Sequence, residues 1–278
     1  MRISSVLSRS RRKFLAACEI LRYAMVRPAR QDFVIVTCER HAGDYALRCL
    51  ESVYRQDYDR GLIHHIFIDD ASQDGTHEKI LHWLESHPGH SVEYIHRDRR
   101  RGGTANTQDG FSRADRGSVV LELNGDDWLP DSKVLDFYSR VYVDDSVWMT
   151  YNTCRVKDGP PGDWACPYPQ EIIRDNAFRD WPVWSASHLH TFRSELFAHL
   201  EEDVFMDPLT GDYWECADDQ AVYLGMLELA GRHAKHLNRI TYIYNFWQES
   251  HSYNDNEKSI ATAARIRQLK RYQPLKAL

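Results

Sequence analysis

Short apolar runs alternate with amphipathic segments over the first half of the chain. Helical segments are predicted at 43–56, 77–87 and 104–115, and Tyr45, Leu47, Leu50 and Val53 form the apolar stripe of the first. Between them lie predicted buried strands at 32–38 (DFVIVTC), 62–70 (LIHHIFIDD), 91–97 (SVEYIHR) and 118–123 (SVVLEL). Strands that alternate with helices indicate crossover units. The pattern therefore predicts an α/β fold with a mainly parallel sheet.

The pattern is looser after residue 150. Residues 157–170 (KDGPPGDWACPYPQ) are rich in Pro and Gly, so we expect a long loop there, with a lid as one interpretation. A helix is predicted at 218–231, ended by Gly231, and a strand at 237–246. A polar loop, 247–259, follows that strand.

Charge separates the N-terminus from the rest of the chain. Residues 1–30 carry eight Arg and Lys and one Glu, whereas the remainder has a net charge of −13. An acidic body argues against nucleic-acid binding as the main function. The basic start predicts an amphipathic helix, broken by Pro28, that lies on a membrane or partner or packs on the body. No apolar run reaches the roughly 20 residues that span a bilayer.

Acidic and polar residues follow the predicted strands. Thr37 and Glu39 come at the end of the first strand, Asp69 and Asp70 at the end of the second, and the stretch Asn124-Gly125-Asp126-Asp127 after the fourth. Ligands of parallel sheets bind beyond the carboxyl ends of the strands. In one interpretation, the paired carboxylates there bind Mg²⁺ or Mn²⁺. In the other, Asp126 simply caps a helix that starts near Trp128. Spacing alone leaves both interpretations open.

Three further segments bear on that choice. FIDDASQDGT places a turn after the second acidic strand end, and HRDRRRGGTANT sets several Arg beside a Gly pair, which suits phosphates. Asp218 and Asp219 open the helix at 218–231. In one interpretation, a carboxylate at this helix N-terminus accepts a proton from a hydroxyl group. In the other, it only complements the helix dipole.

In this order the segments resemble a family 2 glycosyltransferase of the GT-A fold. The segments that carry the resemblance, which covers residues 32 to about 255, are VIVTCER, IDDASQDGT, RRGGTANTQDG, LELNGDDWLP and CADDQAVYLGMLELAG. It implies a Rossmann-like central sheet flanked by helices. It also implies three parts: a basic helix at 1–30, a transferase domain at 31–255 and a C-terminal helix at 256–278. Within the domain, 31–130 would be the nucleotide-sugar-binding half and 131–255 the acceptor-binding half.

The resemblance also assigns roles to residues. Asp126 matches the metal-binding acid of the DXD region, His251 lies where the fold often supplies a further metal or diphosphate ligand, and Asp219 matches the catalytic base. Trp184, His188, His190 and Asp218 fall on the acceptor side. The residues implied in donor binding are Thr37, Glu39, Asp69, Asp70, Asn124, Asp127 and one Arg of 99–101, with Arg101 preferred. Asn124 stands where the family has the first acid of DXD, which predicts weaker metal binding.

The implied activity is metal-dependent, inverting and non-processive transfer of a sugar from a nucleotide sugar. A UDP-sugar is the first donor to consider, and Mn²⁺ or Mg²⁺ the expected cofactor. The acceptor would be a hydroxyl of a glycan or a lipid-linked molecule. Six cysteines without CxxC spacing fit a cytoplasmic protein, peripheral on the cytosolic face of a membrane through residues 1–30. Two alternatives stay open: a degenerate GT-A protein without turnover, and a sugar nucleotidyltransferase.

Overall fold

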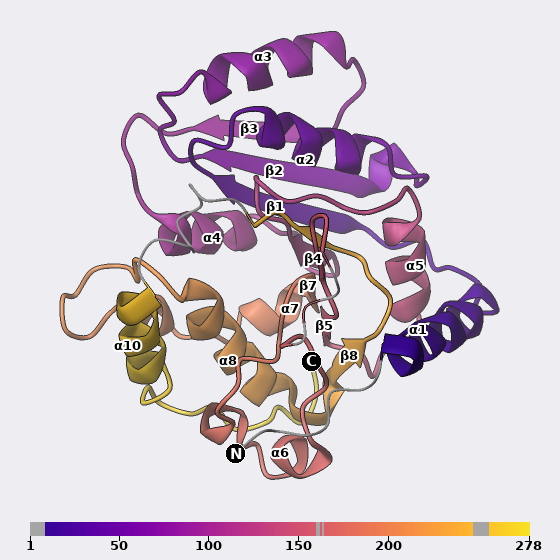
Figure 1. Ribbon diagram of the computed structural model, residues 1–278, viewed down its shortest axis with the longest axis vertical. Helices are drawn as coiled ribbons and strands as arrows, with labels where there is room; N and C mark the ends of the chain where they lie inside the picture. Colours follow the sequence, from indigo (N-terminus) through magenta and orange to yellow (C-terminus); the bar gives the residue numbers. More distant parts are fainter. Residues whose placement is uncertain (1–8, 160–161, 163, 247–255) are drawn as a thin grey trace.

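A seven-stranded sheet lies at the centre of the molecule, in the order β3-β2-β1-β4-β7-β5-β8 (Figure 1). The computed structural model describes residues 9–159, 162, 164–246 and 256–278. The strands of the sheet are β1 (Phe33–Glu39), β2 (Ile63–Asp69), β3 (Val92–His96), β4 (Val119–Glu122), β5 (Met149–Asn152), β7 (His190–Arg193) and β8 (Ala234–Leu237). Strand β7 runs antiparallel to its neighbours β4 and β5, and the other adjacent pairs are parallel. The predicted mainly parallel sheet is confirmed.

Helices cover both faces of this sheet. One face carries α1 (Arg9–Ala24), α2 (Asp44–Tyr54), α3 (Thr76–Ser86) and α5 (Val134–Val141). The other carries α4 (Gly103–Ser112), α7 (Ser194–Phe197), α8 (Asp218–Ala230) and α10 (Asn256–Ile266). Alternate residues of β1 supply both cores, since Phe33 and Ile35 point to the first layer and Val34 and Val36 to the second. Both faces are buried, which explains the continuous apolar runs of the strands.

One local prediction was wrong, and one of the interpretations left open is excluded. The strand expected at 237–246 is two strands, because after β8 the backbone N–H groups of Asn238 and Arg239 donate to the Glu19 carboxylate instead of to a neighbouring strand. The chain then forms β9 (Ile243–Tyr244), which pairs with β6 (Arg155–Val156) in a separate sheet. No helix starts near Trp128, whose backbone bridges to Ile243.

The terminal helices pack against the body. Helix α1 lies beside α5 (Figure 1). The Tyr23 and Phe137 rings of these helices are 5.3 Å apart. Helix α10 occupies the first half of the predicted C-terminal helix, and the residues after Ile266 are not helical. Short helices complete the second half of the chain: α6 (Gln170–Arg174), and the 3₁₀ segments η2 (Phe178–Asp180), η3 (Glu202–Phe205) and η4 (Gly231–His233). Within the described residues, no helix combines the length and hydropathy needed to cross a bilayer.

Candidate active site

Acidic side chains gather at the carboxyl edge of the sheet. Strands β1, β2 and β4 end there at Glu39, Asp69 and Glu122, and Glu39 lies beside Asp69 in the register of β1 and β2. Because β7 runs the opposite way, its first residue, His190, pairs with Glu122 at this same edge. The edge therefore brings together residues that are far apart in the sequence.

A glycine allows the turn after β4 to lie directly on β1. The Gly125 N–H donates to the Cys38 carbonyl (3.3 Å), which extends the pairing of the two strands. A methyl group on Gly125 would lie 2.2 Å from Glu39 Cβ, so a larger residue would displace the turn. The residues on either side, Asn124 and Asp126, are partly exposed. Their oxygen atoms are thus set at the edge of the sheet by a close backbone contact.

Asp127 differs from its neighbour in this turn because it is buried. Its carboxylate accepts hydrogen bonds from the Tyr242 hydroxyl and from the Asn245 backbone N–H (2.6 Å). Burial, followed by the charge of Asp126, raises the pKa of Asp127 well above its ordinary value. These bonds make Asp127 the anchor of the turn to the segment around β9.

Glu39 and Thr37 are also buried. Ser72 links two of the acids, since its hydroxyl donates to Glu39 (3.4 Å) and its backbone N–H to Asp69 (2.9 Å). Burial, and next the charge of Asp69, raises the pKa of Glu39 to about 8. The Thr37 hydroxyl lies 2.9 Å from His65 Nε2, and burial lowers the pKa of that histidine to about 3. Thr37 is therefore paired with a neutral histidine inside the β1–β2 layer.

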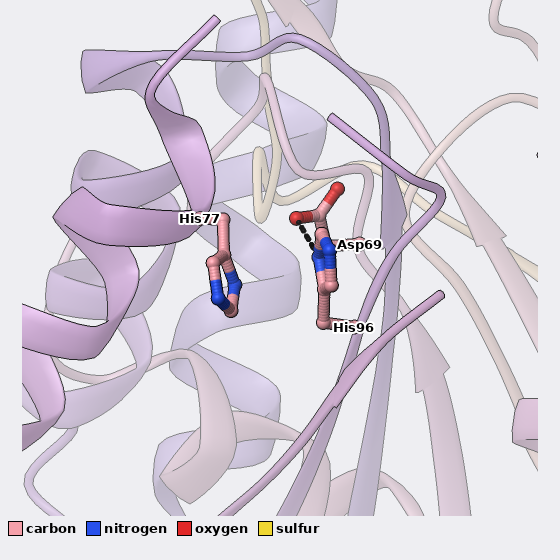
Figure 2. A group of neighbouring side chains, drawn as sticks. All are labelled: Asp69, His77 and His96. Carbon is pink, nitrogen blue, oxygen red and sulfur yellow. Dashed lines mark hydrogen bonds and ion pairs between the residues drawn. The ribbon is translucent and has the colours of Figure 1, made fainter. Parts of the chain in front are cut away.

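Two histidines and a tyrosine surround Asp69. Figure 2 shows the contact of His96 with this acid, and the distance from His96 Nδ1 to Asp69 Oδ2 is 2.8 Å. The Tyr94 hydroxyl donates to the same oxygen (3.1 Å), so His77 Nδ1, 2.8 Å away, donates to Tyr94. Both histidines therefore use Nδ1 for these contacts. Burial opposes ionisation of Asp69, but its hydrogen bonds, those from Ser72 first, hold its pKa below the ordinary value.

Asp70 holds the glycine turn that opens α4. Its two carboxylate oxygens accept the backbone N–H groups of Arg101 (2.7 Å) and Gly102 (2.9 Å). Gly102 has φ +91°, which a residue with a side chain rarely adopts. A methyl group on the next residue, Gly103, would lie 2.9 Å from the Asp218 carboxylate. The start of α4 therefore meets the start of α8, and Asp218 lies at the positive end of the α4 dipole.

The first two residues of α8 are both acidic and partly exposed. Burial, followed by the charge of Asp219, raises the pKa of Asp218 to about 7. Burial also raises the pKa of Asp219, and the charge of the His190 ring is the largest effect opposing it. Carboxylates with raised pKa values are suited to accept a proton near neutral pH.

His190 connects β4 to α8. Its ring stacks on Tyr223 with centroids 3.7 Å apart, one helical turn after Asp219. Its two nitrogens face acceptors, with Nδ1 3.2 Å from Glu122 Oε2 and Nε2 2.9 Å from the Ala186 carbonyl. The His190 ring therefore lies between the acid that ends β4 and the first turn of α8.

The other acceptor-side candidates lie close by. His188 stacks on Tyr242 at 4.9 Å, and burial, then the nearby His190, lowers its pKa to about 3. Trp184 is partly exposed, lies 6.5 Å from the His190 ring and is among the groups that oppose the rise in the pKa of Asp219. Thus Trp184, His188 and His190 share one cluster with the start of α8. His251, the second metal-ligand candidate, lies outside the described residues.

Sequence reasoning missed several residues of this edge. Glu122 was counted as part of an apolar strand. A lone acid inside VVLEL is nevertheless informative, because a carboxylate is seldom buried in a strand without a partner. His96 is the last residue of β3, and Asp69 is the last residue of β2. The position of a polar residue at the carboxyl end of a strand, which selected Asp69, therefore also predicts His96. Tyr223 and Tyr242 could not be predicted, because the sequence does not distinguish them from other aromatic residues of the hydrophobic core.

Comparison with known families shows where the chain belongs. The model described as "Glycosyl transferase family 2" matches residues 32–185, more than half of the chain. The chain belongs to glycosyl transferase family 2. The matched stretch contains β1 to β4 and the Gly125 turn, whereas α8 with Asp218 and Asp219 lies beyond it. No curated protein matches this family member at a significant level.

Solved structures agree on the fold of this family member. The S. aureus TarS fragment 1–349 in complex with UDP-GlcNAc is 15% identical, with a TM-score of 0.62, over 81% of this chain and 61% of that one. The mannosyltransferase PcManGT of Pyrobaculum calidifontis, with GDP-Man and Mn²⁺, is 18% identical, with a TM-score of 0.57, over 86% and 69%. GalNAc-T7 with UDP, GalNAc and Mn²⁺ is 15% identical, with a TM-score of 0.60, over 85% and 47%. The predicted GT-A fold is confirmed, and the chain spans about three fifths of the TarS fragment.

The donor atoms of the Gly125 turn fit a hard divalent cation. Asp126 offers a carboxylate and Asn124 an amide oxygen, which are ligands that Mg²⁺ and Mn²⁺ accept. Across the described residues, groups of three side chains spaced to hold a metal occur at Asp69, His77 and His96 and at Glu122, His188 and His190. Neither group contains Asp126. A cation at the turn would therefore take most of its ligands from water or from a bound diphosphate.

Proposed function

We propose that this family 2 member transfers a sugar from a nucleotide sugar to a hydroxyl group of a glycan or a lipid-linked acceptor. The observation that carries the proposal is the placement of two acidic elements around one sheet edge: the turn with Asp126 packs on Glu39 at the end of β1, and Asp218 lies beside the start of α4. TarS and PcManGT, which share the fold, are in complex with UDP-GlcNAc and GDP-Man. A UDP-sugar is the first donor to test.

The donor side of the proposal comprises residues 31–130. Asp69 receives the nucleoside next to the His77 and His96 rings, while Asp70 holds the glycine turn that lies along the diphosphate. Arg101, whose side chain is partly exposed at this turn, supplies positive charge. The other proposed donor-side residues, at the same edge of the sheet, are Thr37, Glu39, Asn124 and Asp127.

The metal side of the proposal rests on Asp126, with Asn124 beside it and His251 as the further ligand. A bound Mn²⁺ or Mg²⁺ would neutralise the negative charge that develops on the leaving nucleoside diphosphate. Because Asn124 replaces a carboxylate with a neutral amide, we expect weaker metal binding than two acids would give. Asp127, tied to Tyr242 and Asn245, keeps the turn in place.

Asp219 is the proposed base. It takes the proton of the acceptor hydroxyl, and the resulting single displacement inverts the anomeric configuration. Burial raises the pKa of Asp219, which increases its basicity, and the His190 ring is the largest effect that opposes this rise. Trp184, His188 and Asp218 complete the acceptor side, within residues 131–255. Transfer is proposed to be non-processive.

The proposed setting is the cytosolic face of a membrane. All six cysteines are free thiols, as expected in a reducing compartment.

Nucleotide binding tests the donor side. The unfolding temperature of the wild type would be measured with UDP, GDP and other nucleoside diphosphates, each with and without Mn²⁺. We expect one nucleotide to raise it in a Mn²⁺-dependent manner, because a ligand that binds only the folded state stabilises it. Asp126→Ala should abolish the Mn²⁺-dependent part. An equal shift for Asp126→Ala would refute the metal role of this residue.

One observation favours a second candidate, a GT-A protein that binds a nucleotide sugar without turnover. Asn124 offers a neutral amide where a second acid would bind a cation more tightly. A weak metal site would suffice for binding but would slow departure of a diphosphate. The two candidates differ in the release of nucleoside diphosphate from the donor.

A further inference from the structure

Helix α1 is fixed to the body by one of its faces. Glu19 accepts the backbone N–H groups of Asn238 (2.7 Å) and Arg239 (2.8 Å), and the Tyr23 ring is buried against Phe137. Arg140 of α5 donates to the Val26 carbonyl just after the helix (2.6 Å). The orientation of α1 is therefore defined by polar and apolar contacts together.

The opposite face of α1 is apolar and exposed. Phe14, Cys18, Leu21 and Met25 follow one another at intervals of four, three and four residues, which places them on one side of a helix. Phe14 and Leu21 are each 66% exposed and Met25, directly after the helix, 84%, and Cys18 is exposed as well. We call these four residues the outer stripe. Large apolar side chains in such a row are costly in water and mark an interaction surface.

Positive charge borders the outer stripe. Arg11, Lys13, Arg22 and Arg27 are exposed along the same segment. Glu19 is the one acid of residues 9–30, and its carboxylate is turned toward the body. The remainder of the chain beyond residue 30 is acidic, with a net charge of −13. The helix thus presents an apolar row with basic edges and no acid beside it.

We propose that the outer stripe is inserted in the surface of an anionic lipid membrane. An amphipathic helix with an apolar face and Lys and Arg at its borders lies in the interfacial plane and gains from both burial and charge. A second copy of the chain is a poorer occupant, because docking two outer stripes would bring two basic borders together. The charge complementarity therefore selects the lipid surface.

The geometry also relates this surface to the acceptor side. Arg12 Nη1 donates to the Gly162 carbonyl (3.2 Å), and Trp164, two residues on, donates to the Ser187 hydroxyl (3.3 Å). Ser187 directly precedes His188. The membrane-facing helix is thus linked by two hydrogen bonds to the segment that leads into β7. The docking proposal itself does not depend on the proposed transfer activity.

Vesicle co-sedimentation of the full chain tests the proposal. Wild type should bind phosphatidylcholine vesicles that contain 30% phosphatidylglycerol, and bind pure phosphatidylcholine at least tenfold more weakly. The double variant Phe14→Glu/Leu21→Glu should lose at least tenfold in binding to the anionic vesicles, since it places charge in the stripe. Lys13→Gln/Arg22→Gln should lose about fivefold per residue, with a loss that shrinks at high salt.

Leu209→Glu is the matched control, because Leu209 is a 74% exposed leucine away from α1, and its binding should stay within twofold of wild type. All substituted side chains are exposed, so the unfolding temperatures should equal that of wild type. Equal binding of wild type and Phe14→Glu/Leu21→Glu would overturn the proposal. So would failure of wild type to bind anionic vesicles, or a dimer in sedimentation equilibrium that disappears in the double variant.

Discussion

The contact of Gly125 with Glu39 gives the sharpest prediction about the site. In Gly125→Ala the new methyl carbon would lie 2.2 Å from Glu39 Cβ and 2.7 Å from Glu39 Cγ. Carbon atoms in contact are about 3.5–4.0 Å apart, so the turn would have to retreat from β1 by roughly 1.3 Å. Asn124 and Asp126 would move with it.

This displacement has two measurable consequences. Overpacking of this kind destabilises a protein by about 1–3 kcal/mol. A shift of about 1 Å in groups that position a reacting centre costs about a hundredfold in rate. We therefore expect Gly125→Ala to unfold at a lower temperature, to lose Mn²⁺-dependent nucleotide binding, and to be at least a hundredfold slower in donor turnover.

Calorimetric titration of nucleoside diphosphate with Mn²⁺, thermal unfolding and a turnover assay would measure these effects. Gly61→Ala is the matched control, because the nearest atom to its new methyl group is Asp59 Oδ1 at an ordinary 3.4 Å. It should behave as wild type in all three. Gly125→Ala with wild-type stability and turnover within twofold would refute the role given to this turn.

Three further predictions concern acids and ion pairs. Since burial raises the pKa of Glu39 to about 8, the folded state holds a proton that the unfolded state releases above about pH 4.3. The contribution of Glu39 to the free energy of unfolding is therefore full below about pH 4.3. It is lost as the pH rises from about 4.3 to about 8. Denaturant titrations should show that the stability of Glu39→Gln, relative to that of wild type, is higher at pH 8 than at pH 5. A stability difference that does not depend on pH would contradict this. Arg179 and Glu228 form a fully buried ion pair, so Arg179→Ala should cost about 3–5 kcal/mol in free energy of unfolding. The exposed Arg174 is its control, with no measurable change expected in Arg174→Ala, and equal stability of the two variants would rule out the predicted cost. The raised pKa of Asp219 predicts that kcat/KM falls on acidification at a pH above the usual carboxyl range, whereas a flat profile down to pH 4 would exclude this base.

Much of the fold and half of the site could be read from local patterns. Apolar runs set β1 to β4, and the acids at their ends located Glu39, Asp69 and the Gly125 turn without any pairing information. Strand β7 could not be found in this way, because its antiparallel insertion between β4 and β5 depends on long-range pairing. The contact of His190 with Glu122 follows from that insertion. Likewise, Glu19 ends β8 from more than 200 residues away.

Release of nucleoside diphosphate from a panel of nucleotide sugars, with Mn²⁺ and with chelator, tests the central claim most directly. We expect the wild type to hydrolyse one donor slowly in a Mn²⁺-dependent manner, and to release the diphosphate faster when the correct acceptor is present. Asp219→Asn should bind the same nucleotide with unchanged affinity but lose transfer by at least a hundredfold. Binding of a nucleotide without release from any donor, or full transfer by Asp219→Asn, would contradict it.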